Sequence, residues 1–382
     1  MQPFDPIALT QALVRIDSRN PSLAADGPGE IECARALRDV LDGWGFTTEM
    51  VEEVPRRASV IARIGGGAGR SIILNGHIDT VQVDGMTHAP YTPDIRDGKL
   101  WGRGSCDMKG GVAAMCAAAA RAHAAGALHG EAIVTAVADE EWCSIGTRDV
   151  LARGVRAAAA VVTEPTRMAV APAHRGFVWF TITLRGKAAH GSRYDIGVDA
   201  IRHAAMVLCE LDLLEERELV NVTHPLLGHA SLHASLIKGG TAMTTYPDKC
   251  VVRIERRTLP GEVPDQVLAQ VEAACERVKV RRPAFDATIA VDSVREPSDV
   301  ATKAPIVAAM LDATAAKGAR APIEGVSYWS DAALFNAAGI PAVCYGPGDI
   351  ALAHGAVEWI PVDEITKATD VLQHFLGEWT RA

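Results

Sequence analysis

The sequence lacks the long apolar runs of a membrane protein. No uninterrupted apolar segment approaches the roughly 20 residues that a transmembrane helix needs. The first residues of the chain also lack the basic start and the apolar stretch of a signal peptide. These absences predict a protein of the cytoplasm that does not act at a membrane.

Clusters of lysine and arginine are also missing. The formal net charge is -9 at pH 7, whereas a nucleic-acid-binding protein normally shows a basic patch or stripe. We therefore expect no nucleic-acid partner. Hydrophobic residues make up 48% of the chain and charged residues 22%, which is the composition of an ordinary folded globular protein.

Cysteine is present but never in the paired spacings of a zinc ribbon or a redox motif. The eight cysteines are scattered singly: Cys33, Cys106, Cys116, Cys143, Cys209, Cys250, Cys275 and Cys344. We expect reduced and mostly buried thiols. Cys106 and Cys143 lie beside candidate metal ligands, but a lone cysteine is more often a small buried apolar residue than a nucleophile.

The length of 382 residues favours two domains, because one hydrophobic core rarely grows so large. In the first half, helical spacing of apolar residues alternates with short runs rich in Val, Ile and Leu. The predicted strands are 59–64, 71–74, 132–137 and 157–163, and helices are predicted at 30–44, 108–125 and 145–152. This order predicts an α/β/α sandwich with a mostly parallel central sheet.

A different pattern begins near Gly176, in the order strand, helix, strand, strand, helix, strand. That order is typical of the ferredoxin-like split motif, an α+β unit with its own core. Helical spacing resumes after Ser298. We therefore predict a discontinuous catalytic domain, residues 1–175 and 293–382, with a second domain inserted at 176–292.

Polar side chains follow several predicted strands at the point where each strand ends. His77 follows one strand, Glu140 and Glu141 follow the next, and Glu164 follows a third. Ligands of open α/β sheets bind beyond the carboxyl ends of the strands, so we expect these side chains to lie close together. Imidazole nitrogens and carboxylate oxygens are typical ligands of zinc.

Each candidate also has an ordinary explanation when it is taken alone. Asp107 precedes a predicted helix and could simply cap it, although a carboxylate can also bridge two cations. The acids at 139–141 could form a solvated turn, and His354 could be an exposed loop residue. Asp79, two residues after His77, could fix the tautomer of that imidazole. The set as a whole favours two metal ions that share Asp107.

Five motifs, spread over most of the chain, together resemble those of a known protein family. They are His-x-Asp at 77–79, Gly-Arg-Gly-x-x-Asp-Met-Lys-Gly-Gly at 102–111, Asp-Glu-Glu at 139–141, Thr-Glu-Pro at 163–165 and the late His354. In this order they resemble the M20 metallopeptidase family, which contains acetylornithine deacetylase, succinyl-diaminopimelate desuccinylase, aminoacylase and glutamate carboxypeptidase.

The resemblance implies two zinc ions per subunit, with cobalt or manganese as substitutes, and a role for each site residue. His77 and Glu164 would bind one ion, and Glu141 and His354 the other. Asp107 would bridge the two ions, Glu140 would be the general base and Asp79 would orient His77.

The resemblance also implies that the inserted domain is a lid through which two subunits form a homodimer. His190 would reach the partner's site and stabilise the oxyanion, and Arg257 would bind a substrate carboxylate. Because Arg256 is adjacent, the sequence leaves open which of the two arginines contacts the substrate. The sequence has Thr244 where relatives often have Asn, which leaves the substrate contacts of the lid open.

Glutamate at position 164 is typical of the family's deacylases and carboxypeptidases, whereas aspartate there is typical of aminopeptidases. The sequence therefore predicts a dinuclear zinc amidohydrolase that cleaves an N-acyl amino acid or a similar small amide by metal-activated water. A dipeptidase or a glutamate-type carboxypeptidase is the alternative. A metal-free relative that only binds its ligand is a further one.

Overall fold

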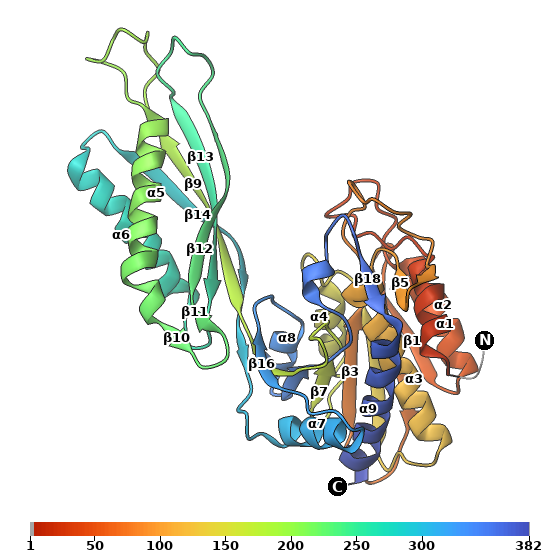
Figure 1. Cartoon of the computed structure of the whole chain (residues 1–382). Helices are drawn as coiled ribbons and strands as arrows, with labels where there is room; N and C mark the ends of the chain where they lie inside the picture. Colours follow the sequence, from red (N-terminus) through yellow and green to blue (C-terminus); the bar gives the residue numbers. More distant parts are fainter. Residues whose placement is uncertain (1–3, 382) are drawn as a thin grey trace. The chain divides into compact units, whose positions relative to one another are not determined.

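The structure, a computed structural model, describes residues 4–381 and contains two compact units. The first unit comprises residues 4–172, 300–324 and 330–381. The second unit comprises residues 173–299 and 325–329. Figure 1 shows their helices and strands, with labels for most of them.

The first unit is built on a twisted sheet whose strand order is β1-β2-β6-β3-β7-β17-β8. Its strands are β1 (Thr47–Val54), β2 (Arg57–Gly65), β3 (Ile72–His77), β6 (Glu131–Val137), β7 (Ala160–Val162), β8 (Val170–His174) and β17 (Ala342–Cys344). The four central strands, β6, β3, β7 and β17, run parallel, and antiparallel strands flank them. This arrangement confirms the predicted α/β fold with a mostly parallel centre.

Helices cover both faces of this sheet. They are α1 (Pro6–Val14), α2 (Ile31–Gly43), α3 (Gly110–Ala124), α4 (Ile145–Ala152), α7 (Pro305–Ala316), α8 (Ala332–Ala337) and α9 (Val362–Arg381). One face shares a core with α1, α2, α3, α7 and α9, while α4 packs on the sheet with α8. Helix α3 is almost wholly buried and rich in alanine, which combines high helix propensity with a small side chain. It therefore fits between the sheet and α9.

A small three-stranded sheet lies beside this core. Its strands are β4 (Ile95–Arg96), β5 (Lys99–Trp101) and β18 (Trp359–Pro361), in the order β18-β5-β4. Trp359 lies opposite Trp101 in the antiparallel pair. Two further short strands, β15 (Ser298–Asp299) and β16 (Ile323–Val326), pair with β8.

The second unit has a four-stranded antiparallel sheet and two long helices. Its elements are β9 (Gly176–Arg185), α5 (Ala200–Arg217), β12 (Ser231–Gly239), β13 (Lys249–Thr258), α6 (Pro264–Arg281) and β14 (Asp286–Arg295), together with the short hairpin of β10 (Thr223–His224) and β11 (Gly228–His229). The strand order β12-β13-β9-β14 is that of the predicted ferredoxin-like motif. Alternate residues of β9, from Val178 to Leu184, face a core of their own with both helices.

Among residues 4–381, no helix combines the length and the apolar character that crossing a membrane requires.

Candidate metal centre

The central parallel strands bring the predicted ligands to one edge of the first unit. His77 is the last residue of β3, and it lies opposite Val137, the last residue of β6. Glu140 and Glu141 follow β6, and Glu164 follows β7, the other neighbour of β3. Because these strands run in the same direction, their carboxyl ends and the side chains beyond them meet at one edge.

Asp107 lies between two histidines that come from distant parts of the chain. Its Oδ1 is 3.0 Å from Nε2 of His77, and its Oδ2 is 3.4 Å from Nε2 of His354. His354 Nε2 also lies 3.0 Å from the carboxylate of Glu141. Each oxygen of Asp107 therefore faces a different imidazole, as a ligand shared between two cations would require.

The ligand atoms form two overlapping groups. Those of His77, Asp107 and Glu141 lie within 4.8 Å of one another, and so do those of His77, Glu140 and Glu164. Asp107, His77 and Glu164 are buried, whereas the side chain of His354 is 52% exposed. The structure thus gathers all five predicted ligands and Glu140, and His354 lies on the side that is open to solvent.

The electrostatics of this cluster are dominated by buried negative charge. Burial raises the pKa of the Glu140 and Glu164 carboxyls well above their usual value, and the negative charges of neighbouring carboxylates raise them further. Burial would raise the pKa of Asp107 as well, but hydrogen bonds with His354 and His77 outweigh it and lower that pKa. Burial opposes the charged form of His354, yet its contacts with Asp107 and Glu141 raise its pKa to about 11.

This donor set fits divalent metal ions. Four carboxylates converge with only two imidazoles, so their negative charge exceeds what the histidines can balance. All of the donors are nitrogen or oxygen, which suits zinc, cobalt or manganese. A cation among them would remove the repulsion that raises the carboxyl pKa values.

Asp79 connects this centre to the main chain around it. Nδ1 of His77 is 3.0 Å from the main-chain oxygen of Asp79 but 3.5 Å from its carboxylate. The carboxylate instead accepts the N–H groups of Glu140, at 3.1 Å, and Glu141, at 3.2 Å. Asp79 therefore holds both acids of the Glu140–Glu141 pair, in addition to its contact with His77.

A buried polar network behind Asp79 was not predicted from the sequence. Asn20 donates to Asp79 and to Asp139, at 2.9 and 3.0 Å. Arg57 binds Asp139 at 2.7 Å and also pairs with Glu30. Of these four supporting residues, only Asp139 belongs to a motif of the sequence, the Asp-Glu-Glu run at 139–141.

His190, predicted to stabilise the oxyanion, and Arg257, predicted to bind a substrate carboxylate, belong to the second unit. His190 is exposed, and its Nδ1 is 2.9 Å from Oγ of Ser192. The guanidinium of Arg257 lies over the ring of Phe177, and its side chain is 29% exposed. Arg256 is buried and pairs with Glu262. Of the two arginines, Arg257 is the more accessible.

Cys106, one of the two cysteines beside the centre, is poorly suited to be a nucleophile. Cys106 is buried, and its Sγ lies 3.3 Å from the main-chain oxygen of Asp349. Burial and nearby carboxylates raise the pKa of Cys106 well above its usual value, which disfavours a nucleophilic thiolate. All eight cysteines are free, and Cys143 is only partly buried.

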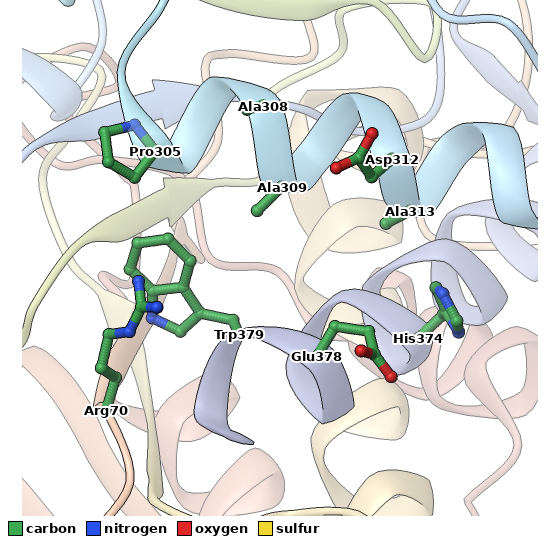
Figure 2. Close-up of a pocket in the computed structure, with 9 residues that line it drawn as sticks. All are labelled: Arg70, Pro305, Ala308, Ala309, Asp312, Ala313, His374, Glu378 and Trp379. Carbon is green, nitrogen blue, oxygen red and sulfur yellow. The ribbon is translucent and has the colours of Figure 1, made fainter. Parts of the chain in front are cut away.

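A hollow in the first unit lies between α7 and α9, away from the metal-ligand cluster (Figure 2). It has a volume of about 580 Å³. Its lining residues are Arg70, Pro305, Ala308, Ala309, Asp312, Ala313, His374, Glu378 and Trp379, none of which belongs to the metal-ligand cluster. The guanidinium of Arg70 lies 4.7 Å from the ring centroid of Trp379.

Comparisons with known proteins show the family of the chain. The profile of peptidase family M20/M25/M40 matches residues 73–378. Acetylornithine deacetylase of Myxococcus xanthus is 32% identical over 352 residues, which cover 88% of this chain and 90% of the relative. N-formyl-4-amino-5-aminomethyl-2-methylpyrimidine deformylase of Bacillus subtilis is 27% identical over 371 residues, covering 89% and 87%.

The fold is shared with solved structures. The crystal structure of a dinuclear metal-binding peptidase of the M20 family from Bacillus subtilis is 18% identical and superposes with a TM-score of 0.75. The match covers 98% of both chains.

Removal of divalent metal by a chelator is expected to lower the melting temperature by roughly 5–10 °C. Binding to the native state at about 100 times Kd stabilises it by about 2.7 kcal/mol. About 1 kcal/mol corresponds to about 2–4 °C in a domain of about 150–250 residues, a range that includes the first unit. Differential scanning calorimetry with and without chelator measures the change. Asp107→Asn should reduce the difference, whereas Glu378→Gln, a change at the hollow of Figure 2, should preserve it. If the chelator leaves the melting temperature of the wild type unchanged, the metal assignment is contradicted.

Proposed function

Because the chain belongs to peptidase family M20/M25/M40, we propose that it is a dinuclear zinc amidohydrolase that removes the acyl group from an N-acyl amino acid or a similar small amide. Membership of this family makes the protein a metal-dependent hydrolase of amide bonds, as the motifs predicted. The observation that carries the proposal is Asp107, which has one carboxylate oxygen on His77 and the other on His354.

The two curated relatives favour acyl removal over peptide cleavage. One is named for the removal of an acetyl group and the other for the removal of a formyl group. The dinuclear peptidase from Bacillus subtilis supports a two-metal centre in this fold, but at 18% identity it does not extend peptidase activity to this chain. A dipeptidase or a glutamate-type carboxypeptidase is therefore the second candidate.

Each metal would take its ligands from residues that the structure already gathers. His77 and Glu164 would hold one ion, Glu141 and His354 would hold the other, and Asp107 would contact both. When bound, the ions would supply positive charge that acidifies water and balances the charge that develops on the amide oxygen.

Glu140 is suited to move the proton of the reaction. Its carboxylate lies within 4.8 Å of the ligand atoms of His77 and Glu164, and a positioned carboxylate can act as a general base. Its carboxylate would accept a proton from the attacking water and pass it to the nitrogen of the leaving amine. Asp79 holds the N–H of Glu140 and so helps to set the position of this carboxylate.

The second unit would contribute substrate contacts and a dimer interface. Strand β12 lies at the edge of its sheet, and Leu236 and Ile237 on it are 61% and 58% exposed. An exposed apolar edge strand is a ready surface for pairing with another chain. We infer a homodimer that pairs these edges, in which His190 stabilises the oxyanion in the partner's site and Arg257 binds a substrate carboxylate.

A panel of substrates tests the proposed reaction. Zinc-loaded protein is incubated with N-acetyl, N-formyl, N-succinyl and N-carbamoyl amino acids and with dipeptides, and the release of free amine is measured. We expect one acyl class to be hydrolysed with a kcat/KM at least about tenfold above that of any dipeptide, a difference of about 1.4 kcal/mol in transition-state binding. Preferential cleavage of dipeptides would instead establish the second candidate.

Replacement of the proposed base tests the assignment of Glu140. Glu140→Gln keeps the size of the side chain but cannot accept the proton, so kcat should fall by about 10²–10⁴ while both metals remain bound. Steady-state kinetics and metal analysis of the same sample give the two values. Glu141→Gln is the matched control, since loss of a ligand should weaken metal binding as well. Full activity of Glu140→Gln would remove this residue from the mechanism.

Charge placed on the edge of β12 tests the dimer. Ile237→Lys should give a monomer in analytical ultracentrifugation at micromolar concentration, because a lysine on a sheet edge opposes pairing with another strand. Val280→Lys on α6, where Val280 is 83% exposed, should leave the assembly unchanged. A monomeric wild type, or a dimeric Ile237→Lys, would contradict the proposed interface.

A further inference from the structure

A buried ion pair lies directly behind the metal centre and takes no part in the mechanism above. Strands β5 and β18 pair with Trp101 opposite Trp359. This register brings Arg103, just after β5, next to Glu358, just before β18. Nη1 of Arg103 is 2.7 Å from Oε2 of Glu358, and both side chains are buried.

Such a pair is poorly explained as a source of fold stability. Taking both charges out of water has a cost that often cancels their attraction, and apolar residues of similar volume frequently stabilise a fold as well. Both members of the pair, however, also make hydrogen bonds to main-chain groups beside proposed metal ligands.

Glu358 holds the segment that carries Asp107. Its Oε1 accepts the main-chain N–H of Cys106 at 3.0 Å and that of Asp107 at 3.2 Å. The backbone of Asp107 is not helical, with φ -121° and ψ 94°, although it lies within the short helical turn Ser105–Lys109 that leads into α3. Two charge-assisted hydrogen bonds thus fix the peptide groups from which the Asp107 carboxylate projects.

Arg103 holds the segment that carries His354. Its Nη2 donates to the main-chain oxygen of Gly355 at 3.1 Å. His354 itself has φ +59°, in the left-handed region that residues with a side chain adopt only rarely. The direction of the His354 ring therefore depends on how the neighbouring peptide is held, and Arg103 holds it.

We propose that Arg103 and Glu358 form a clamp that positions Asp107 and His354 for metal binding. One ion pair joins two segments that are far apart in the sequence, and each partner binds the main chain beside one ligand. This inference rests on the proposed function, because it takes Asp107 and His354 as metal ligands. Arg103 and Glu358 are positioning residues, since they act through the backbone of the ligand segments and through each other.

Glu358→Gln is the first test. It removes the charge that binds Arg103 and weakens the hold on the amides of Cys106 and Asp107. Outer partners of metal ligands typically affect metal affinity by about 10- to 100-fold, so we expect zinc affinity, measured by competition with a chromophoric chelator, to fall by about that factor. Excess zinc should restore much of kcat, because the ligands and Glu140 are all retained.

Arg103→Lys is a milder variant that keeps a positive charge opposite Glu358. It should leave the amides of Cys106 and Asp107 held but remove the hydrogen bond to Gly355. We therefore expect the loss of affinity mainly at the zinc ion that His354 would bind. The competition curve should then show two steps, one with weakened zinc affinity and one with wild-type affinity. This variant also keeps the test decisive if Glu358→Gln does not fold.

Glu210→Gln is the matched control. Glu210 is buried on α5 in the second unit and pairs with the more exposed Arg277 and Arg281 of α6, so its replacement removes a charge contact outside the unit that holds the proposed ligands. It should change the melting temperature without changing zinc affinity. The clamp is overturned if Glu358→Gln and Arg103→Lys behave like this control, with lower melting of the metal-free protein and wild-type zinc affinity.

Asp107→Asn separates this result from a failure of the proposed function. If Asp107→Asn weakens zinc binding while the clamp variants do not, only the clamp is wrong. If Asp107→Asn itself binds zinc like the wild type, the ligand assignment fails and the clamp fails with it.

Discussion

The rest of the catalytic unit depends on the negative charge that is buried at one edge of its sheet. Asp79 and Glu164 lie just beyond the ends of apolar strands, Asp107 lies in the turn that leads into α3, and all three are buried. A buried charge without a partner is very costly. The surroundings compensate with imidazoles and main-chain N–H groups, whereas the nearby arginines, Arg57 and Arg103, are paired with Asp139 and Glu358. The cluster at the centre still carries more carboxylates than these groups balance, and divalent cations are the chemistry that completes it.

Much of this arrangement could be predicted from the sequence because it follows from local rules. Strand β3 is a short buried run that ends in His77, and its parallel neighbours end in the same direction, so the ligands after these strands had to meet. The sequence alone did not decide whether Asp107 caps a helix or is a ligand shared by two metal ions. In the structure Lys109, not Asp107, precedes α3 as its cap residue, and the Asp107 carboxylate faces two histidines.

The supporting residues could not be predicted because their partners are distant in the sequence. Arg57 stands next to Arg56 before a strand, as an exposed charge would, yet it is buried against Glu30 and Asp139. Nothing near Arg103 in the sequence indicates that its partner is Glu358. The pair of Arg103 and Glu358 forms only when β5 and β18 are brought into register. A role for His190 in a partner's site likewise depends on a second chain, which no pattern within one chain specifies.

The proposed metal ligands and the proposed substrate contacts belong to different units of the structure. Every proposed metal ligand, and the clamp behind Asp107 and His354, belongs to the first unit, while Arg257 and His190 belong to the second. The two units also have separate hydrophobic cores. A substitution that reshapes the substrate contacts of the second unit therefore leaves the packing around the metals intact. The two relatives are named for the removal of different acyl groups, and on the proposed roles of Arg257 and His190 the acyl preference of this chain should depend on side chains of the second unit.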